Sequence, residues 1–441
     1  MNAQKITTNL RSKQHWYCEP LLPYEGKIHY SRAVCLYPQL TGQTFEGFGG
    51  AFTESAGYNW EKLNEPAKSE FAQMCFGADG LGYTLGRTHI GSCDFALGNY
   101  AAWDASMTGF DMSRDEKYIF PLLRAASAVI GQSPELLLSP WSPPAFMKTN
   151  GDMNHGGKLK PEYRAAWAQC MAEYVRRYRE AGFTVRLISV QNEPEAVQTW
   201  DSCLYTAEEE GAFAAEYLRP ALDAAGQQDV SILIWDHNKE ELVRRVAESM
   251  NTEKRRAAIG GAAFHWYHGD HFEAVALAKK LFPDKKFYFS EGCVEYSRLD
   301  GATDLEKAEM YAHDILGNLN AGINGSLDWN LLLDEKGGPN HVGNYCEAPI
   351  MLDGNGGLER KGSYWYIGQF SRYIRPGAVR IETSRWCSEL EVTAFRNTDG
   401  STAVVMLNRT DAALPAYLVQ NGVDLLAYTE VQPHTIVTVV L

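Results

Sequence analysis

Between residues 43 and 375, short apolar runs alternate with stretches that have helical periodicity. Each run is short enough for a strand and apolar enough to be buried on both faces. The clearest helix between them covers Glu162–Arg179, where apolar side chains recur every three or four residues and Gly182 follows as a stop. The eight runs are Phe45–Phe52, Tyr83–Ile90, Leu136–Trp141, Leu187–Glu193, Ser231–Asp236, Ala263–Tyr267, Lys286–Glu291 and Ser326–Asn330.

Eight strand–helix units over this length predict an α/β fold of the (β/α)8 TIM-barrel type. A doubly wound open sheet is the alternative. The first run is not followed by a GxGxxG phosphate fingerprint, so a nucleotide-binding fold is disfavoured. In a barrel, functional residues are expected at the carboxyl ends of the strands.

Both chain ends have a different pattern, in which apolar and polar residues alternate as in half-buried strands. From Ala378 to the C-terminus, six such pieces are separated by turn signals such as Asn421-Gly422. Near the N-terminus, Lys27–Tyr30 and Ala33–Tyr37 are short β-like pieces that need partners. We therefore expect an antiparallel β-sandwich side domain from residues 1–42 and 376–441, attached to a catalytic barrel of residues 43–375.

Composition narrows the class of protein. The net charge of −14 argues against nucleic acid or an anionic membrane as a partner. No run approaches the length of a membrane span, and the first residues lack an apolar segment of signal-peptide length. The nine cysteines are scattered, and none forms a CxxC pair. Reduced thiols and a cytoplasmic location are therefore expected; the oligomeric state is left open.

Two glutamates end buried strands. The stretch LISVQNEPEAVQTW, Leu187–Trp200, carries Glu193 directly before Pro194, which should end the strand and keep Glu193 extended. Glu291 ends the seventh run. A glutamate before proline that merely caps a loop is the plainer alternative. Two carboxylates facing each other across a barrel fit a retaining glycosidase, in which one is acid/base and the other is nucleophile.

Several motifs occur in an order that resembles glycoside hydrolase family 30, which includes glucosylceramidases, β-xylosidases and endo-glycanases. The resemblance spans nearly the whole chain. It is carried by Phe48–Glu54, Ser92–Phe95, Ser139–Pro144, Met147–Asn150, Gln191–Pro194, His265–Tyr267, Ser290–Cys293, Asp328–Asn330, Gly337–Asn340 and Val404–Thr410.

The resemblance implies a role for each matching residue. Glu193 would be the general acid/base and Glu291 the nucleophile of a retaining β-glycosidase. Asn192 is expected to bond the sugar 2-hydroxyl, and Tyr267 to direct its hydroxyl at Glu291. Arg87 would lie near the nucleophile, and the other matches would line the sugar subsite: Asp94, Trp141, Trp329 and Asn344. Core packing could also explain Trp141 and Trp329, and a structural ion pair could explain Arg87.

The chain departs from the animal lysosomal enzymes of this family in two places. The segment Glu195–Cys203 is shorter than their aglycone-side loop, and His89 replaces a proline. A small β-glycoside is therefore a better expected substrate than a ceramide-linked one. The sequence leaves open which sugar is bound, and whether the action is exo or endo.

Three other functions are alternatives to a glycosidase. A metal-dependent barrel hydrolase would use His265, His268, Asp270, His271 and Glu291, but the first strand lacks the HxH pair of such enzymes. A sugar-binding protein on an inactive barrel would ordinarily lack one of the two glutamates. An esterase would need a GxSxG elbow, which is missing. No metal or other cofactor is expected.

Overall fold

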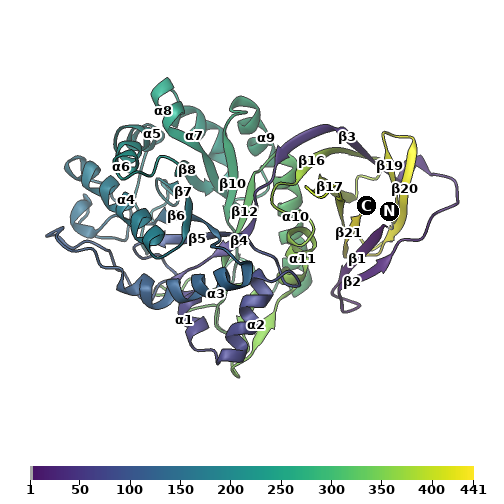
Figure 1. Cartoon of the computed structure of the whole chain (residues 1–441), viewed down its shortest axis with the longest axis horizontal. Coiled ribbons are helices and arrows are strands. Elements are labelled where there is room, and N and C mark those ends of the chain that lie inside the picture. The colour runs from purple at the N-terminus through teal and green to yellow at the C-terminus, as the bar shows by residue number, and fades with distance from the viewer. Residues whose placement is uncertain (1–2) are drawn as a thin grey trace.

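The computed structural model describes residues 3–441 as a barrel with a β-sandwich beside it (Figure 1). Eight parallel strands close the barrel in the order β10-β12-β4-β5-β6-β7-β8-β9, which confirms the predicted fold class. Each of the eight apolar runs overlaps a barrel strand. The strands are β4 (Gly47–Ala51), β5 (Leu85–Ile90), β6 (Glu135–Pro140), β7 (Thr184–Ser189), β8 (Ser231–Asn238), β9 (Ile259–His265), β10 (Lys286–Glu291) and β12 (Gly325–Asn330).

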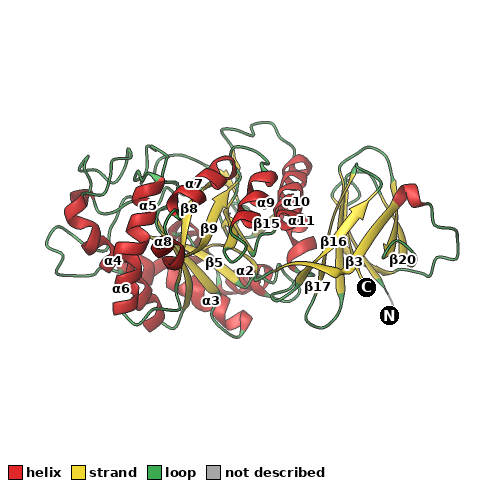
Figure 2. Cartoon of the chain, turned by 90° about the horizontal axis from the view of Figure 1, so that it is seen from above, coloured by secondary structure: helices red, strands yellow, loops and turns green. Residues whose placement is uncertain are grey.

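Helices surround the barrel (Figure 2). The predicted helix 162–179 is a 3-10 turn at Pro161–Tyr163 followed by α4, and Gly182 beyond it has a left-handed φ of 95°. The helices are α1 (Glu54–Glu61), α2 (Glu65–Phe76), α3 (Phe120–Ile130), α4 (Arg164–Glu180), α5 (Ala207–Phe213), α6 (Arg219–Ala224), α7 (Leu242–Ser249), α8 (Glu253–Ala258), α9 (Phe272–Leu281), α10 (Asp304–Ala321) and α11 (Gly362–Ser371). Two short antiparallel strand pairs, β11 (Val294–Glu295) with β13 (Cys346–Glu347) and β14 (Ile350–Leu352) with β15 (Leu358–Arg360), lie in the loops.

An apolar plug fills the lower part of the barrel and supports the polar residues above it. Its members are Leu85, Leu137, Leu233, Ala263, Tyr288 and Leu327, with Leu187 packed against them. Side chains two residues apart on a strand share a face. On each strand, the residue two positions after a plug residue therefore also points into the barrel. It lies one layer closer to the carboxyl ends of the strands. This alternation positions Arg87, Ser139, Ser189, His265, Ser290 and Trp329.

The side domain is a nine-stranded sheet built from both chain ends, in the order β2-β1-β21-β18-β17-β16-β3-β19-β20. It is antiparallel except between β19 and β3. The strands are β1 (Gln4–Asn9), β2 (Gln14–Pro20), β3 (Ala33–Thr44), β16 (Val379–Arg385), β17 (Leu390–Arg396), β18 (Thr402–Asn408), β19 (Leu414–Gln420), β20 (Asp424–Val431) and β21 (Thr435–Val440).

One N-terminal expectation was wrong, and two strands were missed. Lys27–Tyr30 forms no strand, whereas β1 and β2, which the sequence analysis missed, pair with each other, and β1 also pairs with the C-terminal strand β21. Strand β2 has no buried residue, and its sequence QHWYCEP does not alternate apolar and polar residues, so the pattern of a half-buried strand is missing. The domain boundary expected at residue 42 falls inside β3, which continues to Thr44. We propose that the boundary lies at the end of that strand.

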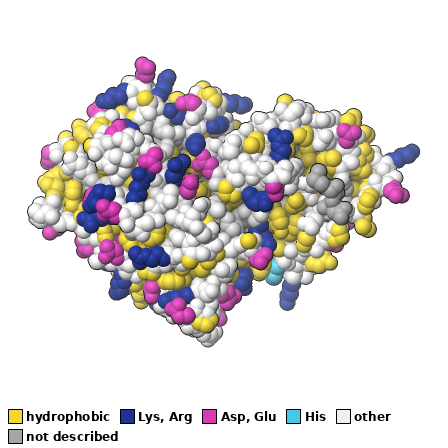
Figure 3. Space-filling model, in the orientation of Figure 1, with side chains coloured by type: hydrophobic (Ala, Val, Ile, Leu, Met, Phe, Trp, Pro, Cys, Tyr) yellow, Lys and Arg dark blue, Asp and Glu magenta, His cyan; other side chains and the backbone are white. Residues whose placement is uncertain are grey.

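Trp16 of β2 joins the side domain to the barrel. Its indole Nε1 donates a hydrogen bond to the Trp365 carbonyl of α11 at 2.8 Å, and the Arg372 guanidinium lies 4.2 Å from its ring centroid. A Cβ added at Gly368 would lie 2.1 Å from this ring, so the two surfaces are in close contact. Figure 3 shows the two lobes, with acidic and basic side chains intermingled on the face in view.

Within the described part of the chain, residues 3–441, no helix is both long and apolar enough to cross a membrane.

The substitution Trp16→Ala should lower the free energy of unfolding by about 3 kcal/mol, because it removes an indole packed between two domains together with its hydrogen bond. Urea unfolding followed by circular dichroism measures this loss. Tyr17→Ala is the matched control, since Tyr17 is 51% exposed, and should change stability by less than about 0.5 kcal/mol. Equal midpoints for the two variants would contradict the assigned interface.

Candidate active site

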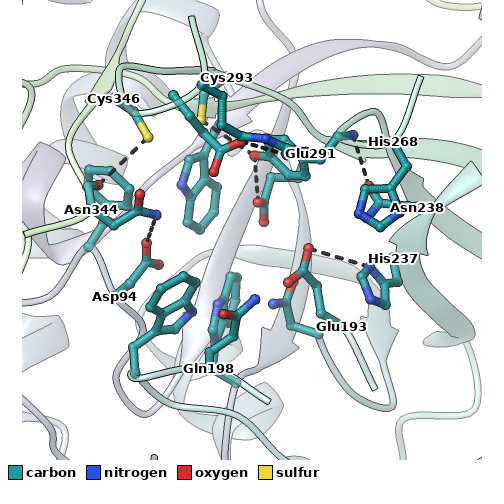
Figure 4. A pocket seen from close by; sticks show the side chains of 18 residues that line it. Asp94, Glu193, Gln198, His237, Asn238, His268, Glu291, Cys293, Asn344 and Cys346 are labelled. Carbon is teal, nitrogen blue, oxygen red and sulfur yellow. Dashed lines mark hydrogen bonds and ion pairs between the residues drawn. The ribbon is translucent and has the colours of Figure 1, made fainter. Parts of the chain in front are cut away.

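A cavity of about 130 Å³ opens at the carboxyl ends of the barrel strands. Glu193 and Glu291 both point into it (Figure 4). The structure thus brings together residues that are far apart in the sequence. Of the residues that the family resemblance singled out, eight line the cavity: Asp94, Trp141, Asn192, Glu193, Tyr267, Glu291, Trp329 and Asn344. Arg87 is the exception, because it lies beneath the cavity and is fully buried.

The guanidinium of Arg87 is the centre of the site. It donates to Glu291 Oε2, to Asn192 Oδ1 at 2.7 Å and to Asp236 Oδ2 at 2.9 Å, and its Nε donates to Ser139 Oγ at 3.2 Å. Burial opposes its charge, but the carboxylates of Asp236 and Glu291 raise the pKa of Arg87 above its usual value. Arg87 therefore forms ion pairs with both Asp236 and Glu291. It is a structural ion-pair partner and also a direct contact of Glu291.

Both carboxylate oxygens of Glu291 accept hydrogen bonds. Arg87 donates to Oε2, and the Tyr267 hydroxyl donates to Oε1 at 2.8 Å. The Tyr267 hydroxyl also lies 3.5 Å from Cys293 Sγ. These two contacts therefore fix the orientation of the Glu291 carboxyl group, which faces the cavity.

Glu193 lies beyond β7, which ends at Ser189. The expected extended geometry was wrong: its φ is 47°, in the left-handed region. Such a conformation before proline costs about 1–3 kcal/mol and persists where the surroundings fix it. Here the Glu193 amide donates to the Asp236 carbonyl at 3.0 Å, and Oε1 lies 3.1 Å from His265 Nδ1. These contacts aim the carboxyl group into the cavity.

Histidines surround Glu193. Its Oε1 is 3.1 Å from His265 Nδ1 and 3.5 Å from His237 Nδ1. Burial raises the pKa of Glu193, but the charges of His237 and His265 outweigh it and lower the pKa to about 2. For His265, burial lowers the pKa, and Glu291, Asp236 and Glu193 together raise it to about 9. The pair of Glu193 and His265 thus keeps one proton over a wide pH range.

Sequence reasoning missed Asp236 and His237 as site residues. Strand β8 is bulged between Trp235 and His237, and Trp235 and Asp236 have φ values of 74° and 47°. The bulge turns Asp236 inward at a place where simple alternation would put Trp235. Asp236 accepts from Arg87 and from the hydroxyls of three serines: Ser139, Ser189 and Ser290. The sequence signal that could have identified Asp236 is its position as a carboxylate residue at the end of a buried apolar run.

The opposite side of the cavity carries aromatic and amide groups. The indoles of Trp141 and Trp329 stack with centroids 5.3 Å apart and an interplanar angle of 20°. Asp94 accepts from Asn340 Nδ2 at 3.1 Å and from Asn344 Nδ2 at 3.5 Å. Burial, and then the nearby charge of Glu291, raise the pKa of Asp94 to about 8.

The five residues that a metal-dependent hydrolase would use do not form one cluster of ligands, because three of them pair with other residues. His268 Nδ1 lies 2.5 Å from Glu240, Asp270 bonds His313 at 3.0 Å, and His271 faces Glu273 at 3.6 Å. Within residues 3–441, the group with metal-ligand spacing is a different one: Glu193, His237 and His265.

Asp94→Asn should stabilise the protein at neutral and mildly alkaline pH. The raised pKa means that the folded state keeps the carboxyl proton up to about pH 8, whereas the unfolded chain loses it near pH 4. Stability contributed by this group therefore falls as pH rises through that window. Urea unfolding should show a gain on the order of 1 kcal/mol at pH 8 and a smaller gain at pH 5.

The matched control for Asp94→Asn is Asp424→Asn at an exposed position of β20, which should change stability by less than about 0.5 kcal/mol at either pH. A loss of stability in Asp94→Asn at pH 8 would contradict this prediction. It would mean that the folded state does not disfavour the ionised carboxyl group of Asp94.

Comparisons with known proteins agree with this geometry. The model of the glycosyl hydrolase family 30 TIM-barrel domain matches residues 45–374, and that of the family 30 beta sandwich domain matches residues 377–439. The crystal structure of SrfJ from Salmonella typhimurium is 40% identical, with a TM-score of 0.96 over 100% of this chain and 99% of that chain.

Two relatives with named activities are also similar. The lysosomal acid glucosylceramidase of Mus musculus is 30% identical over 405 residues, which cover 87% of this chain and 78% of that protein. The endo-1,6-beta-D-glucanase of Neurospora crassa is 26% identical over 391 residues, covering 83% and 79%. Because the family models together match nearly the whole chain, the protein belongs to glycoside hydrolase family 30.

Proposed function

We propose that this β-glycosidase of family 30 is a retaining enzyme that acts on small β-glycosides with a polar aglycone. One observation carries the proposal: Glu193 and Glu291 share one cavity but have opposite surroundings. Glu291 receives two hydrogen bonds from donors, whereas Glu193 is paired with a histidine that stores a proton. Two carboxyl groups in different environments can divide the nucleophile and acid/base roles.

In the first step, Glu291 attacks the anomeric carbon and Glu193 gives a proton to the glycosidic oxygen. Arg87 and Tyr267 hold Glu291 ionised and oriented for the attack. The hydrogen-bonded pair of Glu193 and His265 supplies the proton. In the second step, Glu193 acts as base and removes a proton from water, which releases the sugar from Glu291.

Asn192 is oriented for the sugar by Arg87. The guanidinium takes the amide oxygen, so the Nδ2 group of Asn192 is left to donate to the sugar 2-hydroxyl, a contact that strengthens in the transition state. Asp94 and Asn344 offer hydroxyl-binding groups on the other side of the cavity. Trp141 and Trp329 offer apolar surface to the ring.

The outer part of the cavity supports a polar aglycone. Its rim includes Gln198, His268, Glu295 and Arg298, and Arg298 pairs with Glu295 at 3.0 Å. Burying a lipid chain against these charged groups would desolvate them without giving them new partners. This weighs against sphingolipid substrates, although a relative is a glucosylceramidase.

An endo-acting glycanase is the second candidate. Trp200, half-buried in the loop after β7, lines the same cavity and offers an indole face to a sugar on the leaving-group side. A relative is an endo-1,6-beta-D-glucanase.

The cytoplasmic location stays a prediction. All nine cysteines are free thiols in the structure, and eight of them are buried. Cell fractionation with an antibody against the chain tests the location.

The role assignments predict different defects for two variants. Glu291→Gln should lose at least about 10⁴-fold in kcat on every β-glycoside, because it lacks the nucleophile. Glu193→Gln should lose far less in the first step on 4-nitrophenyl glycosides than on alkyl glycosides, because a good leaving group needs no proton. Initial rates on a panel of 4-nitrophenyl β-glycosides and matching alkyl glycosides measure both. Equal losses of Glu193→Gln on both substrate types would overturn its acid role.

Trp200→Ala tests the aglycone side. With a sugar stacked on Trp200, the variant should raise KM for a β-linked disaccharide about 10-fold, a loss of about 1–2 kcal/mol. It should leave the KM for a methyl glycoside of the same sugar unchanged. Val197→Ala in the same loop is the control, since Val197 is 63% exposed and does not line the cavity. If Trp200→Ala affects both substrates equally, Trp200 does not contact the aglycone.

A further inference from the structure

We propose that Glu193, His237 and His265 form a binding site for one divalent transition-metal ion of the zinc class, and that the bound ion blocks hydrolysis. The inhibition rests on the acid/base role proposed for Glu193, whereas the binding does not. The three side chains come from different strands or their ends: Glu193 follows β7, His237 lies in β8 and His265 ends β9.

The spacing of the three ligand atoms fits a metal ion. All lie within 4.8 Å of one another, with Glu193 Oε1 3.1 Å from His265 Nδ1 and 3.5 Å from His237 Nδ1. A tetrahedral zinc ion with bonds of about 2.0–2.1 Å separates its ligand atoms by about 3.4 Å. Two edges of the site therefore already have the required length, and two histidines with one glutamate are a known zinc ligand set.

His237 supplies an independent observation. Its Nδ1 is buried and makes no hydrogen bond, although its side chain is only 13% exposed. Figure 4 shows this imidazole directed at the Glu193 carboxyl group. A buried polar atom without a partner is rare in a folded protein. A metal ion between His237 and Glu193 would give this nitrogen a partner.

The residues behind the ligands also suit a metal. His265 Nε2 lies 3.2 Å from Asp236 Oδ1, which fixes the ring so that Nδ1 faces the cavity. A carboxylate bonded to the far nitrogen of a ligating histidine is the usual support of a zinc site. Asp236 is itself fixed by Ser290 at 2.6 Å and Ser139 at 2.9 Å. Both the ligand and its support are thus oriented before any ion binds.

The charges around the three ligands and their position at the cavity favour binding of a divalent cation. The carboxylates of Glu193, Glu291 and Asp236 surround the site, while Arg87 adds one fixed positive charge. The cavity leaves a fourth coordination position for water. A metal on Glu193 Oε1 would occupy the oxygen nearest both histidines, and Glu193 could then no longer exchange a proton with the leaving group.

Calorimetric titration of the chelator-treated full chain with ZnCl₂ tests the binding. One ion should bind, and His237→Phe should weaken its affinity at least about tenfold. The matched control is His268→Phe, because His268 lines the same cavity but is outside the triad; it should bind zinc like the unchanged protein. His237→Gln serves as a second variant if circular dichroism shows that His237→Phe does not fold.

Zinc should also inhibit hydrolysis of a 4-nitrophenyl glycoside, with the inhibition constant raised in parallel in the His237 variants. Unchanged zinc affinity in these variants would overturn the site. If zinc binds through His237 and hydrolysis continues at full rate, the metal site stands and the acid/base role of Glu193 is wrong. Absence of zinc binding with normal hydrolysis would leave the proposed function intact and refute the metal site.

Discussion

The active site depends on one fully buried guanidinium, that of Arg87. It bonds two carboxylates, an amide and a hydroxyl that come from four different barrel strands or the loops after them. A buried charge in such a network is costly to leave without partners; removing one partner costs about 3–5 kcal/mol. Folding of the barrel and orientation of the site are therefore coupled. Once the barrel closes around Arg87, Glu291, Asn192 and Asp236 have little freedom to turn elsewhere.

The apolar plug beneath Arg87 shows why much of this arrangement could be predicted from the sequence. Buried strands appear as apolar runs, and the period of two along each strand fixes which side chains lie above the plug. Glu291 and the strand that leads to Glu193 follow from these rules, and the ordered motifs indicated the family. Together they were sufficient to predict the barrel, the sandwich and the two glutamates.

The parts that could not be predicted depend on local backbone geometry. The bulge in β8 brings Asp236 inward, and a left-handed φ at Glu193 overrides the preference of a residue before proline. Both are held by contacts between strands that are distant in the sequence. Strand β2 was missed for another reason: it is mostly exposed, and its place in the sheet is set by pairing with β1 and by Trp16 at the barrel.

The environments of the two glutamates connect the family chemistry with the features of this chain. Arg87 and Tyr267 donate hydrogen bonds to Glu291, while Glu193 shares its proton with His265 and lies beside His237 Nδ1, which makes no hydrogen bond. The same group of atoms can thus hold a proton for catalysis or a metal ion that prevents it. The polar residues Gln198, His268, Glu295 and Arg298 line the same cavity as the two glutamates.

Double displacement through Glu291 would release the first product with the β configuration retained. Proton NMR during hydrolysis of a reactive β-glycoside, recorded before mutarotation, resolves the two anomers of the released sugar. The β-anomer should appear first, and the α-anomer only later by mutarotation. Initial formation of the α-anomer would show a single displacement by water, and Glu291 could not be the nucleophile.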